Sequence, residues 1–336
     1  MSTTPTRHDD AWYRTRLADP SLQPRVVIDT DAANEIDDQF ALAWALLCGR
    51  LRVEALYAAP FSFAHRRATL GRTLRDERPF APPGVGMQRS LEEIERVCAH
   101  CGVDSGGLVH AGAKDYLTSA TEPQPSAAAH DLVARALATP EGERLYVLAL
   151  GCVTNIASAW LIEPAVAERL VVVWTSGYPS YAPHRNDSFN LEQDLHASRL
   201  LMDSGMPLVY LPGFHVGAQL RLSLPEVERW VRGRGAIGDY LHHLFTHNPL
   251  WELQGIDSFY AHSWTMWDLI CVAWLQDPAL VPTEWTRTPR LGDDRRWVPG
   301  DQGRALMREG YAVRRDAIFG GLFGALAGMS DGRAKA

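Results

Sequence analysis

Short apolar runs alternate with stretches in which apolar positions recur every three or four residues through the first two thirds of the chain. A short apolar run bounded by turn residues predicts a buried strand, and the 3.6-residue spacing predicts a helix. The predicted strands are residues 25–30, 53–59, 145–150, 170–177 and 207–213. The predicted helices are residues 39–47, 128–138, 154–162 and 195–205. This alternation predicts an α/β fold, a mainly parallel open sheet with helices on both faces.

The rest of the chain carries fewer such signals. Residues 90–102 are predicted as a helix, and the Pro- and Gly-rich residues 77–86 as a loop. After Pro225 the pattern is helical, and a hairpin is predicted in residues 286–298. Repeats and low-complexity linkers are absent from the sequence, so we expect a single domain. The expected division is an N-terminal extension 1–24, a catalytic domain 25–328 and a flexible tail 329–336.

Composition narrows the class of protein. The chain has 336 residues, of which 46% are hydrophobic and 22% charged, as in a globular protein. Its net charge of -7 argues against nucleic acid and membrane surfaces as partners. The N-terminus lacks an apolar signal-peptide core, and no run reaches the roughly 18 apolar residues of a membrane span. Five scattered cysteines are typical of reduced thiols, so a cytoplasmic location is expected.

Five acidic residues follow the first predicted strand within ten positions. They are Asp29, Asp31, Glu35, Asp37 and Asp38. Ligands of open parallel sheets bind beyond the carboxyl ends of the strands, where this cluster lies. Capping of the next helix would explain one or two of these acids, but not five. Carboxylates this close repel one another, and a hard cation such as Ca²⁺ or Mg²⁺ resolves the repulsion, although the spacing is not that of an EF-hand.

The segment DTDAANEIDD resembles the N-terminal aspartate motif of the nucleoside hydrolase family, the inosine-uridine-preferring N-ribohydrolases. That motif is usually DxDxGxDD. Here two more residues separate Asp31 from Asp37, as in one branch of the superfamily with an NEIDD-type motif. Three further segments resemble family motifs in the same order: LALGCVTNIASA (148–159), SFNLEQDLHAS (188–198) and MWDLICVAWLQDP (266–278).

The resemblance implies a metal site with one Ca²⁺ per chain. Asp31 corresponds to the metal-bound aspartate that also acts as general base, and Asp38 and Asp268 to carboxylates that hold the ion. The carbonyl of Leu150 corresponds to a further ligand, and Asp29 to a residue that supports this set.

The resemblance also implies a sugar site and a reaction. Asp37 corresponds to the residue that binds the ribose 2′-hydroxyl, and Asn190 to the one that binds the 5′-hydroxyl. Coordination would lower the pKa of a water, Asp31 would take its proton, and the water would attack the anomeric carbon. The expected function is therefore Ca²⁺-dependent hydrolysis of a small-molecule nucleoside to base and ribose, in nucleoside salvage, by a homodimer or homotetramer.

Three positions depart from the family pattern. Trp267 stands where the family commonly has a histidine; an indole cannot protonate a leaving base, but it can stack on one or pack in the core. Ser188 replaces a glutamate that supports the sugar. The asparagine usual after the second strand is absent from residues 57–61, and Asn186 could supply an amide instead.

Other polar residues are weaker candidates. His262, six residues before Asp268, could reach the leaving group, and His215 follows a strand. The lone pair Cys98 and Cys101 does not predict a zinc or redox site. Three histidines without acidic neighbours indicate a solvated or partner-facing helix: His242, His243 and His247.

Three functions are compatible with these residues. The first is an N-glycosidase acting on ribonucleosides, which the four matching aspartates favour because a pure binder needs no general base. The second is a homologue that binds metal and sugar without turnover. The third is a hydrolase of a modified or non-ribose N-glycoside, which the change at Ser188 favours.

Overall fold

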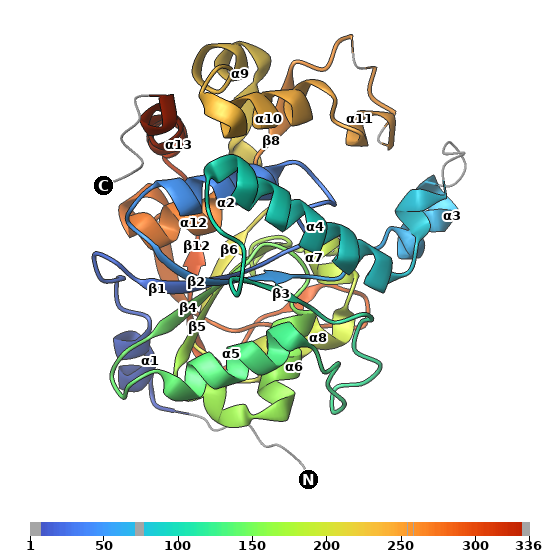
Figure 1. Cartoon of the computed structure of the whole chain (residues 1–336). Helices are drawn as coiled ribbons and strands as arrows, with labels where there is room; N and C mark the ends of the chain where they lie inside the picture. Colours follow the sequence, from blue (N-terminus) through green and yellow to red (C-terminus); the bar gives the residue numbers. More distant parts are fainter. Residues whose placement is uncertain (1–7, 71–76, 254, 258, 331–336) are drawn as a thin grey trace.

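The computed structural model describes residues 8–70, 77–253, 255–257 and 259–330, arranged around one large sheet (Figure 1). The strand order in this sheet is β3-β2-β1-β4-β5-β6-β12-β9, and every neighbouring pair is parallel except β12 with β9. The strands are β1 (Arg25–Thr30), β2 (Arg52–Ala58), β3 (Val109–Ala111), β4 (Leu145–Ala149), β5 (Leu170–Ser176), β6 (Leu208–Pro212), β9 (Thr283–Arg287) and β12 (Leu306–Gly310). The predicted α/β fold is confirmed.

Helices cover both faces of the sheet (Figure 1). One face carries α2 (Asp37–Leu47), α4 (Pro83–Cys101), α12 (Leu269–Gln276) and α13 (Arg315–Ser330). The other carries α5 (Ala127–Ala138), α6 (Thr154–Ile162) and α8 (Leu195–Asp203). Successive side chains of a strand point to opposite faces, so both layers need apolar residues, which explains the continuous apolar runs in the sequence.

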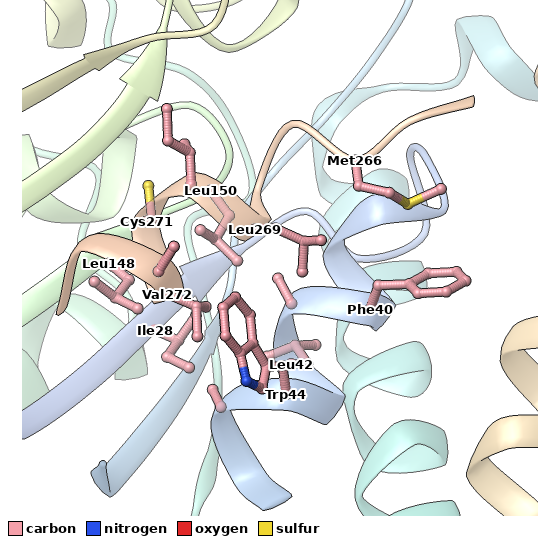
Figure 2. Packing of buried hydrophobic residues seen from close by; sticks show 14 of the residues in the cluster. Ile28, Phe40, Leu42, Trp44, Leu148, Leu150, Met266, Leu269, Cys271 and Val272 are labelled. Atoms are coloured by element: carbon pink, nitrogen blue, oxygen red, sulfur yellow. The ribbon is translucent and has the colours of Figure 1, made fainter. Parts of the chain in front are cut away.

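The core on the first face fixes the helices that carry the acidic residues. Figure 2 shows Trp44 of α2 beside Ile28 of β1 and Val272 of α12, and each of these side chains is at most 1% exposed. A Cβ atom at Gly321 of α13 would lie 2.8 Å from the Trp44 ring, so the small residue allows close packing. The amino ends of α2 and α12 are thereby held beside β1 and β4.

Several elements differ from the sequence-based expectation. The predicted loop 77–86 is only partly a loop, since α4 begins at Pro83, where proline is well tolerated in the first turn. Within the expected extension 1–24, α1 (Asp10–Arg16) packs on the sheet, and the Tyr13 hydroxyl donates to the Gly205 carbonyl at 2.8 Å. The hairpin is formed by β10 (Arg290–Leu291) and β11 (Trp297–Val298), whereas Thr286 belongs to β9.

The C-terminal helix and a small antiparallel sheet complete the fold. Residues 331–336 of the expected tail lie outside the described residues, and α13 continues to Ser330. A small antiparallel sheet joins β7 (Arg221–Ser223) to β8 (Ser263–Thr265), and α9 (Leu224–Trp230) and α10 (Gly235–Thr246) stand beyond it. Among the helices of the described part, none is long and apolar enough to cross a membrane.

Candidate active site

A pocket of about 300 Å³ opens at the carboxyl ends of the parallel strands. Its walls come from the β1–α2 loop, from the segments that follow β4, β5 and β6, and from the β7–β8 sheet. In a parallel sheet the segments after neighbouring strands converge at this edge, which is where open α/β sheets bind ligands.

Four aspartates on this wall come from two parts of the chain, three from the β1–α2 segment and one from the segment before α12. Asp31 lies just beyond β1, Asp37 and Asp38 begin α2, and Asp268 immediately precedes α12. Each is at most 3% exposed. Carboxylate oxygens of Asp37, Asp38 and Asp268 lie within 4.8 Å of one another. Among the ion pairs of the described residues, none involves these four carboxylates.

Burial raises the pKa of every carboxyl in this group. For Asp38 the negative charges of Asp31 and Asp37 add to the desolvation, and for Asp268 those of Asp37 and Asp38 do so. Burial raises the pKa of Asp37 to about 7, although backbone N–H groups, including those of Trp267 and Asp268, oppose the shift. Acids held in this way are stabilised either by protons or by a cation.

Asp31 sits at the junction of β1 and β4. Its Oδ2 accepts a hydrogen bond from the Asn34 amide at 3.2 Å. A Cβ atom at position 151 would lie 2.8 Å from its Oδ1, so Gly151 is needed for the chain to pass this close to the carboxylate. Just before that glycine, the carbonyl of Leu150 lines the pocket and accepts from the Asn190 amide at 2.5 Å. The structure therefore brings the predicted general base, carbonyl ligand and sugar-binding asparagine together.

Two residues of β1 lie next to this group, and one of them bonds a member of it. The Thr30 hydroxyl donates to Oδ1 of Asp38. Asp29 is 1% exposed and lies outside the pocket lining, where its Oδ1 accepts from the Asn155 amide at 2.9 Å. Burial raises the pKa of Asp29 to about 7 despite that hydrogen bond. The supporting role of Asp29 stays a prediction, because its hydrogen bond goes to Asn155 and not to a member of the carboxylate group.

The arrangement fits a hard divalent cation. Oδ1 of Asp37 is buried and, within the described part of the chain, has no hydrogen-bond partner. Three buried carboxylates with only oxygen donors match the preference of Ca²⁺ and Mg²⁺. The geometric cluster contains Asp37 where the predicted ligand set contains Asp31, so both residues are ligand candidates beside Asp38, Asp268 and the Leu150 carbonyl.

Aromatic side chains also line the pocket. Trp267 is half-buried on the pocket surface, and its ring meets that of Phe214 edge to face at 5.9 Å. Trp264 and Phe189 line the same pocket. Ser188 also lines it, and its hydroxyl lies 3.0 Å from that of Ser176. Trp267 is therefore placed where it can contact a ligand, as the stacking hypothesis requires.

Two predicted substrate residues are not brought to the pocket lining. Asn186 is fully buried; its Oδ1 accepts from the Tyr178 backbone at 2.7 Å, and its amide donates to the Arg295 carbonyl at 3.1 Å. It thus joins two loops behind the site. His262 is exposed, and its carbonyl accepts from Leu224 at the start of α9.

The pocket also contains polar residues for which no role was predicted. Asn34 and Glu35 come from the lengthened segment between Asp31 and Asp37, so the unusual motif length was the available signal. Burial raises the pKa of Glu35, and the negative charges of Asp37 and Asp38 raise it further. Arg66 and Arg221 come from separate short elements that carry no local signal of function.

Comparison with known proteins agrees with this geometry. Residues 26–308 match the family model described as inosine-uridine preferring nucleoside hydrolase. A search of curated protein sequences gave no significant match.

Similar folds occur among solved structures. A plant nucleoside hydrolase superposes with a TM-score of 0.67 at 17% identity, covering 90% of this chain and 99% of that one. A purine-preferring ribonucleoside hydrolase from Gardnerella vaginalis gives 0.67 at 16% identity, with coverages of 91% and 99%. The type III effector protein XopQ, complexed with adenosine diphosphate ribose, gives 0.60 at 15% identity, with coverages of 95% and 98%.

Proposed function

The chain belongs to the inosine-uridine preferring nucleoside hydrolase family, a family of N-ribohydrolases, and we propose that it is a Ca²⁺-dependent enzyme that cleaves ribonucleosides into base and ribose. One observation carries this proposal: three buried carboxylates without ion-pair partners face Asp31 in a pocket at the carboxyl ends of the strands. Such a set would hold a divalent cation that, when bound, supplies Lewis-acid activation of water.

The protein's own groups would perform the remaining steps. Asp31 accepts a proton from the attacking water, whose oxygen bonds to C1′ as the C1′–N bond breaks. The electron pair of that bond leaves with the base, which takes up a proton. Asp37 accepts a hydrogen bond from the 2′-hydroxyl, and the amide oxygen of Asn190 accepts one from the 5′-hydroxyl. The buried carboxylates also stabilise the positive charge that develops on the sugar.

Leaving-group activation determines the base preference in this proposal. Trp267 can stack on the base but cannot protonate it. A purine can accept a proton at N7 from another donor, whereas a pyrimidine has no equivalent ring nitrogen. Purine ribonucleosides should therefore be hydrolysed faster than pyrimidine ones. The exposed position of His262 makes it a weaker proton donor candidate than its sequence position suggested.

A nucleoside panel tests both parts. Purified protein is incubated with inosine, adenosine, uridine and cytidine, and reducing-sugar release is followed with and without a chelator. Trp267→Ala should remove stacking worth about 1–3 kcal/mol and so lower kcat/KM for inosine. His262→Ala should have the smaller effect on kcat/KM. Faster cleavage of uridine than inosine, together with a nearly inactive His262→Ala variant, would make His262 the acid.

A binding protein without turnover is the second candidate. The fold similarity to an effector complexed with adenosine diphosphate ribose, and the missing histidine at Trp267, favour it. It predicts Ca²⁺-dependent binding of ribose or nucleosides with no sugar release from any member of the panel.

The cellular setting is also a proposal. The five cysteines are free, four of them buried, which supports a reducing cytoplasmic location. A role in nucleoside salvage would follow from the proposed reaction. We expect a homodimer or homotetramer, and light scattering coupled to gel filtration would measure its mass.

A further inference from the structure

Two arginines line the pocket of an enzyme whose expected substrates are uncharged. Arg66 ends the short helix η1 (Ala64–Arg66), and Arg221 begins β7. A neutral nucleoside gives neither guanidinium a charged partner. The carboxylates that pair with each guanidinium group within the protein determine how much positive charge is left for a ligand.

Arg221 carries an uncompensated charge. Its Nη2 donates to the Ser263 hydroxyl at 2.7 Å across the β7–β8 pair, and Ser263 also lines the pocket. Among the ion pairs within 4.0 Å in the described residues, none involves Arg221. Its backbone is fixed from the other side, because Arg315 donates to the Arg221 carbonyl at 2.7 Å. The exposed guanidinium is thus held at the rim by neutral partners.

Arg66 shares its counter-charge with a second arginine. Its Nε donates to Glu192 at 2.5 Å, while Arg295 donates to the other oxygen of the same carboxylate at 2.5 Å. One carboxylate between two guanidinium groups leaves one positive charge in excess. His65 is a further partner of Glu192 at 3.0 Å, and Nη2 of Arg66 donates to the Asp187 carbonyl at 2.6 Å. The exposed carboxylate of Asp187 also lines the pocket and offsets part of this excess.

The position of Arg66 relates it to one end of the sugar. Its guanidinium carbon lies 5.2 Å from the centre of the Phe189 ring. Phe189 stands in the chain between Ser188 and Asn190, and all three line the pocket. Asn190 is the residue expected to bind the 5′-hydroxyl. At Ser188 a small neutral side chain replaces the family's glutamate, so the wall near the 5′ position has lost a negative charge that would repel an anion.

We infer that the pocket accepts a sugar with a phosphate on its 5′ oxygen, as in a nucleoside 5′-monophosphate, with Arg66 and Arg221 as the phosphate-binding residues. Guanidinium groups are well suited to phosphate because their N–H donors match its oxygens. This inference rests on the proposed function for its chemistry. The same C1′–N bond breaks, water supplies the new C1′ oxygen, and the products are the base and ribose 5-phosphate, with the phosphoester bond unchanged.

Paired substrates test the inference. We would measure kcat/KM for inosine against inosine 5′-monophosphate, and for uridine against uridine 5′-monophosphate, by release of free base. The wild-type protein should favour the monophosphate at least about tenfold, the size expected for one charged hydrogen-bonded contact. Arg221→Gln should lower this ratio about tenfold, and Arg66→Gln should lower it as well.

Arg52→Gln is the matched control. It removes the same charge at the start of β2, at the opposite end of the strands, and should leave the ratio unchanged. Asp187→Asn removes the opposing carboxylate and should raise the ratio. If wild type favours the unphosphorylated nucleosides and Arg221→Gln leaves the ratio unaltered, the inference is wrong while the proposed hydrolase function stands.

Binding separates this inference from catalysis. With Ca²⁺ present, calorimetry should give a Kd for ribose 5-phosphate at least about tenfold below that for ribose, and Arg221→Gln should remove the difference. Tight ribose 5-phosphate binding without base release from any substrate would support the phosphate site and contradict the hydrolase. Equal affinities for the two sugars would overturn the phosphate site even if nucleosides are cleaved.

Discussion

Buried or half-buried charged side chains lie at both ends of strands β1 and β2. Those at the amino ends form ion pairs, whereas the acids at the carboxyl ends form none within the described chain. At the amino ends, the guanidinium of Arg25 donates to both oxygens of Glu54, at 2.8 and 3.0 Å, and Arg135 of α5 lies 3.9 Å from the same carboxylate. At the carboxyl ends, Asp31 and Asp38 share a pocket wall with further acids and take part in no ion pair of the described chain.

The pKa shifts record this difference. Hydrogen bonding from Arg25 lowers the pKa of Glu54 more than burial raises it. Burial raises the pKa of Asp31 and Asp38, and neighbouring carboxylates raise both further. Paired charges hold strands and helices together, whereas unpaired acids cost stability and are explained by a ligand that neutralises them.

Substitution of the general base should give the largest effect. Asp31→Asn keeps the size of the side chain but removes a proton acceptor and a ligand charge, so kcat should fall by several orders of magnitude. The same change removes a buried repulsive charge, so the metal-free protein should gain thermal stability. Steady-state kinetics and thermal unfolding measure both. A variant with near wild-type kcat would show that Asp31 is not the base.

Local sequence patterns predicted the parts of the fold and site that depend on local chemistry. The five predicted strands were recognisable because a strand buried on both faces reads as a continuous apolar run. β12 was missed because its sequence includes Arg308 and Glu309. Glu309 is 2% exposed, and it is compensated by Ser180, whose backbone N–H donates to it at 2.6 Å across 129 residues.

The same limit applies to the pocket. Its aspartates were predictable because the acids lie in one short motif and in one segment before α12. Arg221 could not be predicted, since its place depends on the pairing of β7 with β8, 42 residues away along the chain. Asn186 was predicted as a substrate ligand, yet its amide is used by the backbone of two loops.

Calcium binding should give the second largest effect, an increase in stability at the carboxyl ends of the strands. Purified protein should hold about one Ca²⁺ per chain, and Ca²⁺ at one hundred times its Kd should stabilise the fold by about 2.7 kcal/mol. Asp268→Asn should abolish most of this stabilisation. Asp37→Asn separates two roles: unchanged Ca²⁺ affinity would assign it to the sugar, and a large loss would make it a ligand. If elemental analysis finds no divalent metal and the Tm does not respond to Ca²⁺, the predicted metal site is wrong.

The pH dependence of the metal-free protein should have the sign set by the acidic end. Burial raises the pKa of Asp29 and Asp37 from 3.8 to about 7, so between these values the folded state holds protons that the unfolded state has lost. Stability should therefore fall as pH rises from about 4 to about 7. Saturating Ca²⁺ should reduce the part of this loss of stability that comes from the carboxylates that bind the ion. Urea unfolding at several pH values measures it, and a metal-free protein that is more stable at pH 8 than at pH 5 would contradict it.

Glu54→Gln tests the paired end and should have the smallest effect of the four. The side chain of Glu54 is 10% exposed, and its removal as an anion leaves Arg25 without its main partner. We expect a loss of about 2 kcal/mol in the free energy of unfolding, with kcat for nucleoside hydrolysis within about twofold of wild type because the pair lies at the far end of the strands from the pocket.

The lowered pKa of Glu54 means that its contribution to stability is present above the unfolded pKa of 4.5 and is lost as pH falls through the folded pKa. The stability difference between wild type and variant should therefore shrink in acid, opposite to the trend at the carboxyl ends. A variant with unchanged stability, or one with strongly reduced kcat, would show that the two ends do not divide stability and function in this way.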